Sequence, residues 1–148
     1  MSLSNLTSLY KQVILDHANQ PHHKGKLKKA TNGATLQNPS CGDLIQLKIN
    51  LQNDKIKDIG FTGSGCTISQ ASASMMTDAV LGKNRDQALL MAQTFSDMII
   101  GKKHPKKDLD QLKDATILSN IMKFPTRIKC ATLAWWALKD TLKNKGLS

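Results

Sequence analysis

The sequence predicts an α+β protein, because a strand hairpin is followed along the chain by a series of helices. Apolar and polar residues alternate over residues 44–51, and apolar residues return over residues 55–62 after a turn at Asn53 and Asp54. From residue 67 onward the apolar residues follow the helical period. The chain of 148 residues is long enough for a core of its own, so we expect one domain over residues 1–148.

The N-terminal part is expected to contain a helix and a weak strand. The helix covers residues 3–17, and its apolar residues recur at helical spacing: Leu6, Leu9, Tyr10, Val13 and Ile14. The strand covers residues 30–37 and ends at a turn formed by Asn38 and Pro39.

Three histidines, His17, His22 and His23, stand at the end of this helix and in the loop after it. Imidazole is a common metal ligand, but no carboxylate stands near them at ligand spacing. We therefore favour a surface loop over a metal site here.

Two helices are expected after the hairpin. The first covers residues 67–81, and Met75 and Met76 lie in its buried stripe, where they are expected to fill the core rather than bind a ligand. The second starts at Asn84, because Gln87 completes a capping box. Its apolar face is assigned to Leu89, Leu90, Phe95, Met98 and Ile99.

Two more helices are expected in the C-terminal third, over residues 108–122 and 126–143, with a break at Phe124 and Pro125. In the last helix we expect five residues to be buried: Ile128, Leu133, Trp136, Ala137 and Leu142.

The three cysteines of the chain are Cys41, Cys66 and Cys130. Cys41 and Asp43 stand at the start of the outgoing hairpin strand, and Cys66 follows the end of the returning strand, so the hairpin brings these residues together. Three sulfurs and one carboxylate can fill a tetrahedral zinc shell. The alternative is three unrelated buried cysteines, since their intervals match no generic zinc-finger spacing.

The charges around the cysteines favour a common site. A zinc ion with three thiolates and one carboxylate carries a net negative charge, which nearby cations or open backbone donors must balance. Arg127 and Lys129 flank Cys130, and Cys66 and Cys130 both stand near predicted helix N-termini.

Composition and the apolar pattern argue against several other functions. The net charge of +10 permits an acidic partner, but the aromatic content of 4% and the lack of a groove-reading motif argue against nucleic-acid binding. The sequence contains no run of about 18 consecutive apolar residues, which a membrane span would need, and no signal peptide is visible. The odd number of cysteines is typical of a reducing compartment, so a cytoplasmic location is expected.

Four motifs stand in order over most of the chain, at residues 38–43, 63–69, 71–76 and 124–135. In sequence and in order they resemble the motifs of the IscU/SufU family of iron–sulfur cluster assembly proteins. Within that family the chain resembles the SufU branch. Lys129 stands where the scaffold branch has a histidine, a Leu-Pro-Pro-Val-Lys motif is absent, and the stretch between Cys66 and Cys130 is longer.

This resemblance implies an α+β fold with helices on one side of a small antiparallel sheet. It also implies a zinc-dependent sulfurtransferase that takes persulfide sulfur from a SufS-type cysteine desulfurase, which uses pyridoxal phosphate, and passes it to downstream iron–sulfur assembly proteins. By motif position, Cys41, Asp43, Cys66 and Cys130 are the zinc ligands, Cys41 accepts the sulfur and Arg127 is needed for transfer. A monomer or weak dimer is expected.

Two alternatives remain open at this point. The same four residues could hold a transient [2Fe–2S] cluster on a scaffold protein, against which Lys129 argues. The zinc could also be purely structural, in a binding module without catalysis.

Overall fold

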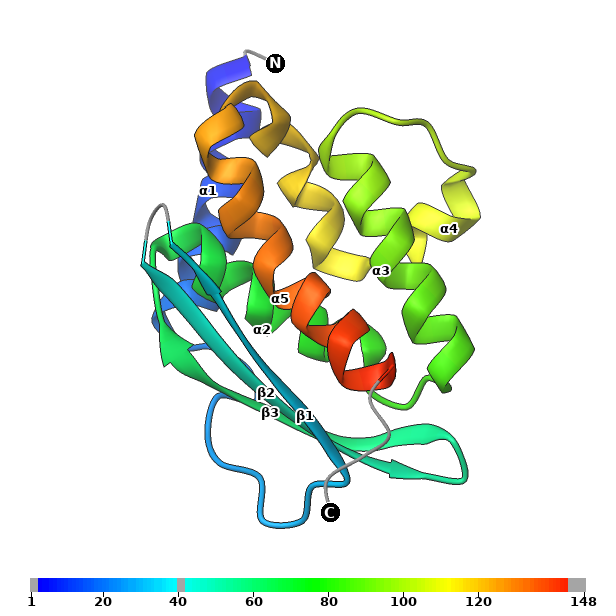
Figure 1. Ribbon diagram of the computed structural model, residues 1–148. Helices are drawn as coiled ribbons and strands as arrows, with labels where there is room; N and C mark the ends of the chain where they lie inside the picture. The colour runs from blue at the N-terminus through cyan, green and yellow to red at the C-terminus, as the bar shows by residue number, and fades with distance from the viewer. Residues whose placement is uncertain (1–2, 40–41, 144–148) are drawn as a thin grey trace.

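The computed structural model describes residues 3–39 and 42–143, with side chains from residue 9 onward except at residue 122. Its elements follow in the order α1 (Leu3–Asn19), β1 (Asn32–Asn38), β2 (Asp43–Gln52), β3 (Lys55–Ser64), α2 (Thr67–Val80), α3 (Arg85–Ile99), α4 (Lys106–Asp110), the 3-10 helix η1 (Lys113–Lys123) and α5 (Pro125–Lys143). The predicted α+β class is confirmed, and the weak strand predicted near residue 30 is β1 (Figure 1).

The sheet is antiparallel, with the strand order β1-β2-β3. Residues Asn53 and Asp54 connect β2 to β3, and both have positive φ angles, of 53° and 64°. Two such residues form the kind of turn that matches the natural twist of a hairpin. The predicted hairpin is therefore present, with its turn at the expected residues.

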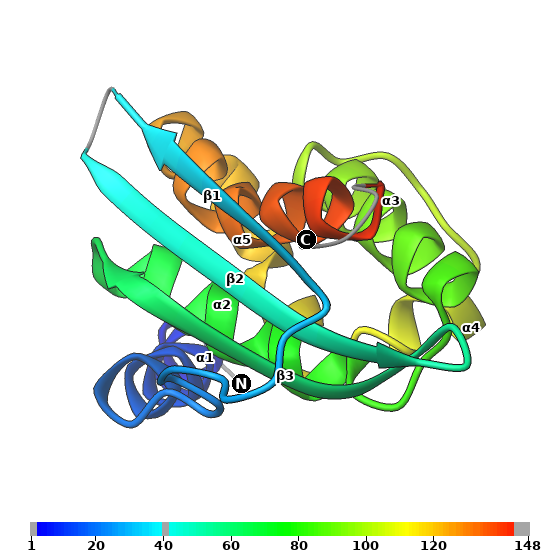
Figure 2. The ribbon, with the colours of Figure 1, turned by 60° about the horizontal axis from the view of Figure 1, so that its bottom comes forward.

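The helices gather on one face of this sheet, as Figure 2 shows with the strands in front of them. Along β2, Ile45, Leu47 and Ile49 are fully buried, whereas Gln46 between them is exposed. Alternating burial of this kind places every second side chain of the strand in the core. Helix α5 contacts both β1 and β2, so it lies directly against the sheet.

Short side chains let α2 and α5 approach each other closely. Ala71 and Ala73 are fully buried, and the Ser72 hydroxyl between them donates a hydrogen bond to the backbone oxygen of Ala131 in α5. Small residues at a helix contact bring the two backbones near one another. This contact fixes the start of α2 relative to α5, which matters for the cysteines described below.

The loop between α1 and β1 runs along the outer edge of β3 at Phe61. The Gly25 amide donates to the Phe61 carbonyl at 2.8 Å, and the Phe61 amide donates to the His23 carbonyl at 3.1 Å. Lys24 and Phe61 thereby form a parallel bridge. A Cβ on Gly60 would lie 3.0 Å from the Gly25 oxygen, so a residue without a side chain suits this contact.

Some side chains expected in the core are exposed. Trp136 is 48% exposed, because its neighbour Trp135 is the one that points inward and stacks on Phe95 at 4.6 Å between ring centroids. Leu90 is 58% exposed for the same reason, since adjacent helical residues point in different directions. In α1, Leu9 is also exposed, and the side chain of Leu6 lies outside the described part of the chain.

The helix predicted over residues 108–122 is divided into two. Lys113 has a φ angle of 53°, a left-handed conformation that an α-helix cannot continue through. The short α4 therefore ends before it, and η1 begins there as a 3-10 helix. The break predicted at Phe124 and Pro125 is confirmed, because α5 begins at Pro125.

Gly63 gives a stability prediction with a matched control. Its φ angle is +136°, and a Cβ there would lie 2.0 Å from the Leu44 oxygen in the paired strand. Gly82 also has a positive φ, but a Cβ there meets nothing within 4 Å. We expect Gly82→Ala to cost about 1–2 kcal/mol from backbone strain alone. Gly63→Ala should cost more, because β2 and β3 must also separate. Urea unfolding of both variants in chelator checks this, and equal losses would contradict it.

Candidate metal centre

The first two residues of the candidate site meet where the hairpin opens. Asp43 is the first residue of β2, and Cys66 is the N-cap residue of α2, two positions after β3 ends at Ser64. Since Leu44 pairs with Ser64, the two lie side by side. The Cys66 amide donates to Asp43 Oδ1 at 3.0 Å, and Cys66 Sγ lies 3.8 Å from Asp43 Oδ2.

Cys130 comes to the same place from α5. It is 1% exposed, as is Asp43, whereas Cys66 is half-buried. One ligand atom from each of Asp43, Cys66 and Cys130 lies within 4.8 Å of the other two. Two thiols and a carboxylate that converge while largely shielded from water are a donor set suited to zinc, which prefers sulfur and also accepts oxygen.

The loop between β3 and α2 is shaped to press against Asp43. A Cβ on Gly65 would lie 2.6 Å from Asp43 Oδ1 and 2.3 Å from Ser69 Oγ, so glycine is needed for this close approach. Ser69 in turn donates its hydroxyl hydrogen to the Cys66 carbonyl at 3.0 Å. These contacts hold the carboxylate and the Cys66 thiol in fixed positions relative to each other.

The electrostatic surroundings favour anionic ligands. Cys66 is at the positive end of the α2 dipole, and the first turn of α2 contains no acidic residue. Helix α5 begins at Pro125, five residues before Cys130, and its first turn also contains no acidic residue. Arg127 and Lys129 are exposed, so their charges face solvent near the site rather than lying buried within it. Exposed cations of this kind are available to a binding partner.

Cys41 lies outside the described residues. The described residues before and after it are close together: Asn38 pairs with Asp43, and the Gly42 amide donates to the Asn38 carbonyl at 2.8 Å. Gly42 has a φ angle of +75°, which favours glycine. The role of Cys41 as a fourth ligand thus stays a prediction from the motif.

The expectation that the three histidines have no carboxylate partner is wrong. His17 contacts Asp114 at 2.9 Å, and His22 and His23 both contact Asp78. Sequence spacing misses these partners because Asp78 and Asp114 are supplied by α2 and η1, far along the chain. The only signal available was the accumulation of three histidines within seven positions.

Fold and site define a small α+β protein that brings cysteine and aspartate side chains together at the open end of a hairpin. The chain belongs to the IscU/SufU family of iron–sulfur cluster assembly proteins, because the family model described as the NifU-like N terminal domain matches residues 9–141.

Two curated relatives align over nearly the whole chain. The "Iron-sulfur cluster assembly scaffold protein IscU" of Streptococcus pyogenes serotype M1 is 50% identical, over 97% of this chain and 89% of its own length. The "Zinc-dependent sulfurtransferase SufU" of Bacillus subtilis strain 168 is 47% identical, over 97% and 96%. A crystal structure from Fervidobacterium islandicum AW-1, described as an iron-sulfur cluster assembly scaffold protein for the SUF system (FiSufU), matches with a TM-score of 0.81 and 32% identity, over 92% of this chain and 98% of that one. These matches agree with the predicted fold and family.

Among the described residues, no helix combines the length and the apolar character needed to cross a membrane.

Proposed function

We propose that this protein is a zinc-dependent sulfur acceptor of the SufU type. It takes persulfide sulfur from a SufS-type cysteine desulfurase and passes it to iron–sulfur cluster assembly. The observation that carries the proposal is the convergence of Asp43, Cys66 and Cys130 within 4.8 Å. The 47% identity to a protein named a zinc-dependent sulfurtransferase supports it.

The proposed zinc ligands are Cys41, Asp43, Cys66 and Cys130. Two sulfurs and a carboxylate fit zinc, and Cys41 supplies the third sulfur of the proposed shell. Bound zinc supplies no redox chemistry and keeps its cysteine ligands deprotonated. Asp43 and Cys130 are almost fully shielded from solvent, which suits them to holding the ion throughout the reaction.

Cys41 is the proposed acceptor. Its thiolate attacks the outer sulfur of the persulfide on the desulfurase cysteine, a new S–S bond forms at Cys41, and the old S–S bond breaks. The desulfurase cysteine leaves as a thiolate, and Cys41 then carries the persulfide. The reaction is an exchange between sulfurs, so it needs no external oxidant or reductant.

A scaffold function on the same residues is the second candidate, because the Streptococcus pyogenes relative, at 50% identity, is named a scaffold. The proposed cofactor would then be a [2Fe–2S] cluster in place of Zn²⁺. Lys129 favours the sulfurtransferase, because the scaffold branch typically has a histidine there.

One experiment separates the two candidates. Metal analysis of the purified protein is combined with a cysteine desulfurase assay and with anaerobic reconstitution in iron and sulfide. Bound zinc together with stimulated desulfurase turnover supports the sulfurtransferase. A stable coloured cluster that displaces zinc, without stimulation, supports the scaffold. Zinc without either effect would indicate a purely structural metal.

The proposed partners are the desulfurase and downstream assembly proteins in the cytoplasm, with the protein acting as a monomer or weak dimer. The net charge of +10 suits an acidic partner surface, since opposite charges speed encounter.

Arg127 is expected to be needed for transfer but not for zinc binding. Its side chain is exposed, three residues before Cys130 on the same helix, where it can engage the desulfurase. Arg127→Ala should lower desulfurase stimulation about ten- to a hundredfold, the loss expected for one hydrogen bond to a charged group. Zinc content should stay at the wild-type level.

The control is Lys143→Ala, which removes an exposed cation at the far end of α5. Arg127→Lys separates charge from the forked shape of arginine. If the Arg127→Ala variant stimulates the desulfurase as strongly as the wild-type protein, Arg127 is not needed for transfer.

A further inference from the structure

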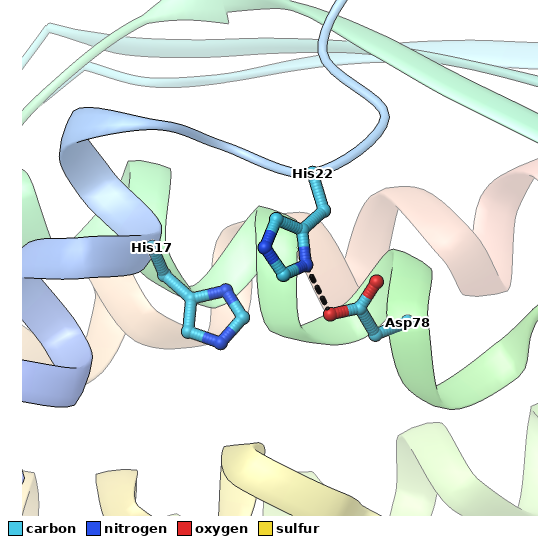
Figure 3. A group of neighbouring side chains, drawn as sticks. All are labelled: His17, His22 and Asp78. Atoms are coloured by element: carbon cyan, nitrogen blue, oxygen red, sulfur yellow. Dashed lines mark hydrogen bonds and ion pairs between the residues drawn. The ribbon is translucent and has the colours of Figure 1, made fainter.

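We infer that His17, His22 and Asp78 form a second metal site, for a divalent late first-row transition ion such as Zn²⁺. One ligand atom from each of the three lies within 4.8 Å of the other two. Figure 3 shows the two imidazole rings and the carboxylate beside one another, with the His22–Asp78 contact dashed. The rings of His17 and His22 are 4.7 Å apart between centroids.

The fold holds His22 in place before any ion binds. The His22 amide donates to Ser74 Oγ at 2.8 Å, and the Thr77 hydroxyl contacts the His22 carbonyl at 3.3 Å. The loop after α1 is thereby fixed against α2, the helix that also supplies Asp78. A ligand on a fixed backbone loses less conformational entropy on binding, so the site is partly preorganised.

Asp114 sets the ring of His17 for metal binding. His17 Nε2 lies 2.9 Å from Asp114 Oδ2, and an ionised carboxylate can only accept, so Nε2 carries the proton. The lone pair is then on Nδ1, which lies 2.7 Å from Ser74 Oγ and accepts its hydrogen. A metal-bound histidine commonly has its other ring nitrogen on a carboxylate. An ion at Nδ1 takes the place of the Ser74 hydrogen bond.

The cluster can be reached from solvent. The His17 side chain is 5% exposed, whereas His22 is 52% and Asp78 is 30% exposed. An ion can therefore arrive past His22 and keep water on its remaining positions. Two imidazoles and one carboxylate are the ligands of zinc, copper, nickel and iron rather than of calcium or magnesium.

This cluster is separate from the cysteine site. Cys66 precedes the first residue of α2, and Asp78 lies near the end of that helix. The twelve helical steps from Cys66 to Asp78 span about 18 Å. The two sites can thus be occupied and removed independently.

The test is a Co²⁺ titration of the full chain, first loaded with zinc and freed of loosely bound metal. We expect one further equivalent of Co²⁺, with visible d–d absorption but without the intense sulfur-to-metal charge-transfer band of a thiolate site. Uptake of no Co²⁺, or uptake only with that charge-transfer band, overturns the inference.

Variants assign the ligands. His22→Asn and Asp78→Asn should each weaken the second equivalent at least tenfold, and Asp114→Ala should weaken it about 10–100-fold by releasing the His17 ring. His104→Asn is the control, because His104 bonds Asp97 at 2.9 Å and belongs to neither site.

His17 itself is left unchanged, since it is buried. Each metal-free variant is checked for a wild-type unfolding temperature, so that lost binding reports a lost ligand. Wild-type Co²⁺ affinity in both His22→Asn and Asp78→Asn contradicts the assignment.

Discussion

Cys41→Ala is expected to abolish sulfur acceptance while the protein still holds zinc. The proposed zinc site keeps Asp43, Cys66 and Cys130, of which Asp43 and Cys130 are buried in the fold. From the sequence, Cys41 is predicted to lie in a short turn between Pro39 and Gly42, where we expect fewer packed neighbours to move when a ligand leaves the metal. Desulfurase turnover should then fall to the rate of the desulfurase alone.

The measurement is mass spectrometry after incubation with a cysteine desulfurase and cysteine, with peptide mapping of the added sulfur. In the wild-type protein the extra sulfur should map to Cys41, and in Cys41→Ala it should be absent. Zinc content measured on the same samples separates loss of the acceptor from loss of the metal. Sulfur found mainly on Cys66 or Cys130, with Cys41 unmodified, would refute the assignment.

Removing a ligand from the buried part of the site is expected to lose both zinc and stability. Cys130→Ser replaces a buried thiol with a hydroxyl, a poor zinc ligand at neutral pH, and Cys66→Ser makes the same replacement at a half-buried thiol at the start of α2. When free zinc is about a hundred times its dissociation constant, binding adds about 3 kcal/mol to stability. For a chain of this length, the unfolding temperature should fall by about 10 °C.

A chelator supplies the control for this second prediction. Wild-type protein in excess chelator should unfold at nearly the same temperature as Cys130→Ser, and the chelator should not lower the melting temperature of the variant further. A variant that binds one zinc at wild-type affinity would show that Cys130 is not a ligand. Gly82→Ala, remote from the cysteines in the sequence, should keep its response to the chelator.

The sequence predicted those parts of the fold that depend on local patterns. The β2–β3 hairpin follows from period-two alternation, and the Asn84 capping box is present with both of its hydrogen bonds. The hairpin also explains why Asp43 and Cys66 could be placed together from the sequence alone. Their convergence with Cys130 depends on how α5 lies against the sheet and α2, which the family motifs indicated and local patterns did not.

Other features depend on contacts that no local pattern encodes. Trp135 and Trp136 are equally apolar in sequence, and only the packing against Phe95 decides that Trp135 is the buried one. Likewise, the carboxylate partners of the histidines, Asp78 and Asp114, belong to helices that are distant from them along the chain. The left-handed residue that divides the expected helix, Lys113, is not a type that favours this conformation, so sequence rules did not find it.

The bridge between Lys24 and Phe61 limits strand addition by other chains at the edge of β3. An unpaired strand edge invites strand addition from a second chain, which is a common route to aggregation. At Phe61 the amide and the carbonyl are both already bonded to the segment before β1, so this part of the sheet has no backbone groups left for an incoming strand. The loop that contains His22 and His23 thus blocks strand addition at Phe61, near the middle of β3.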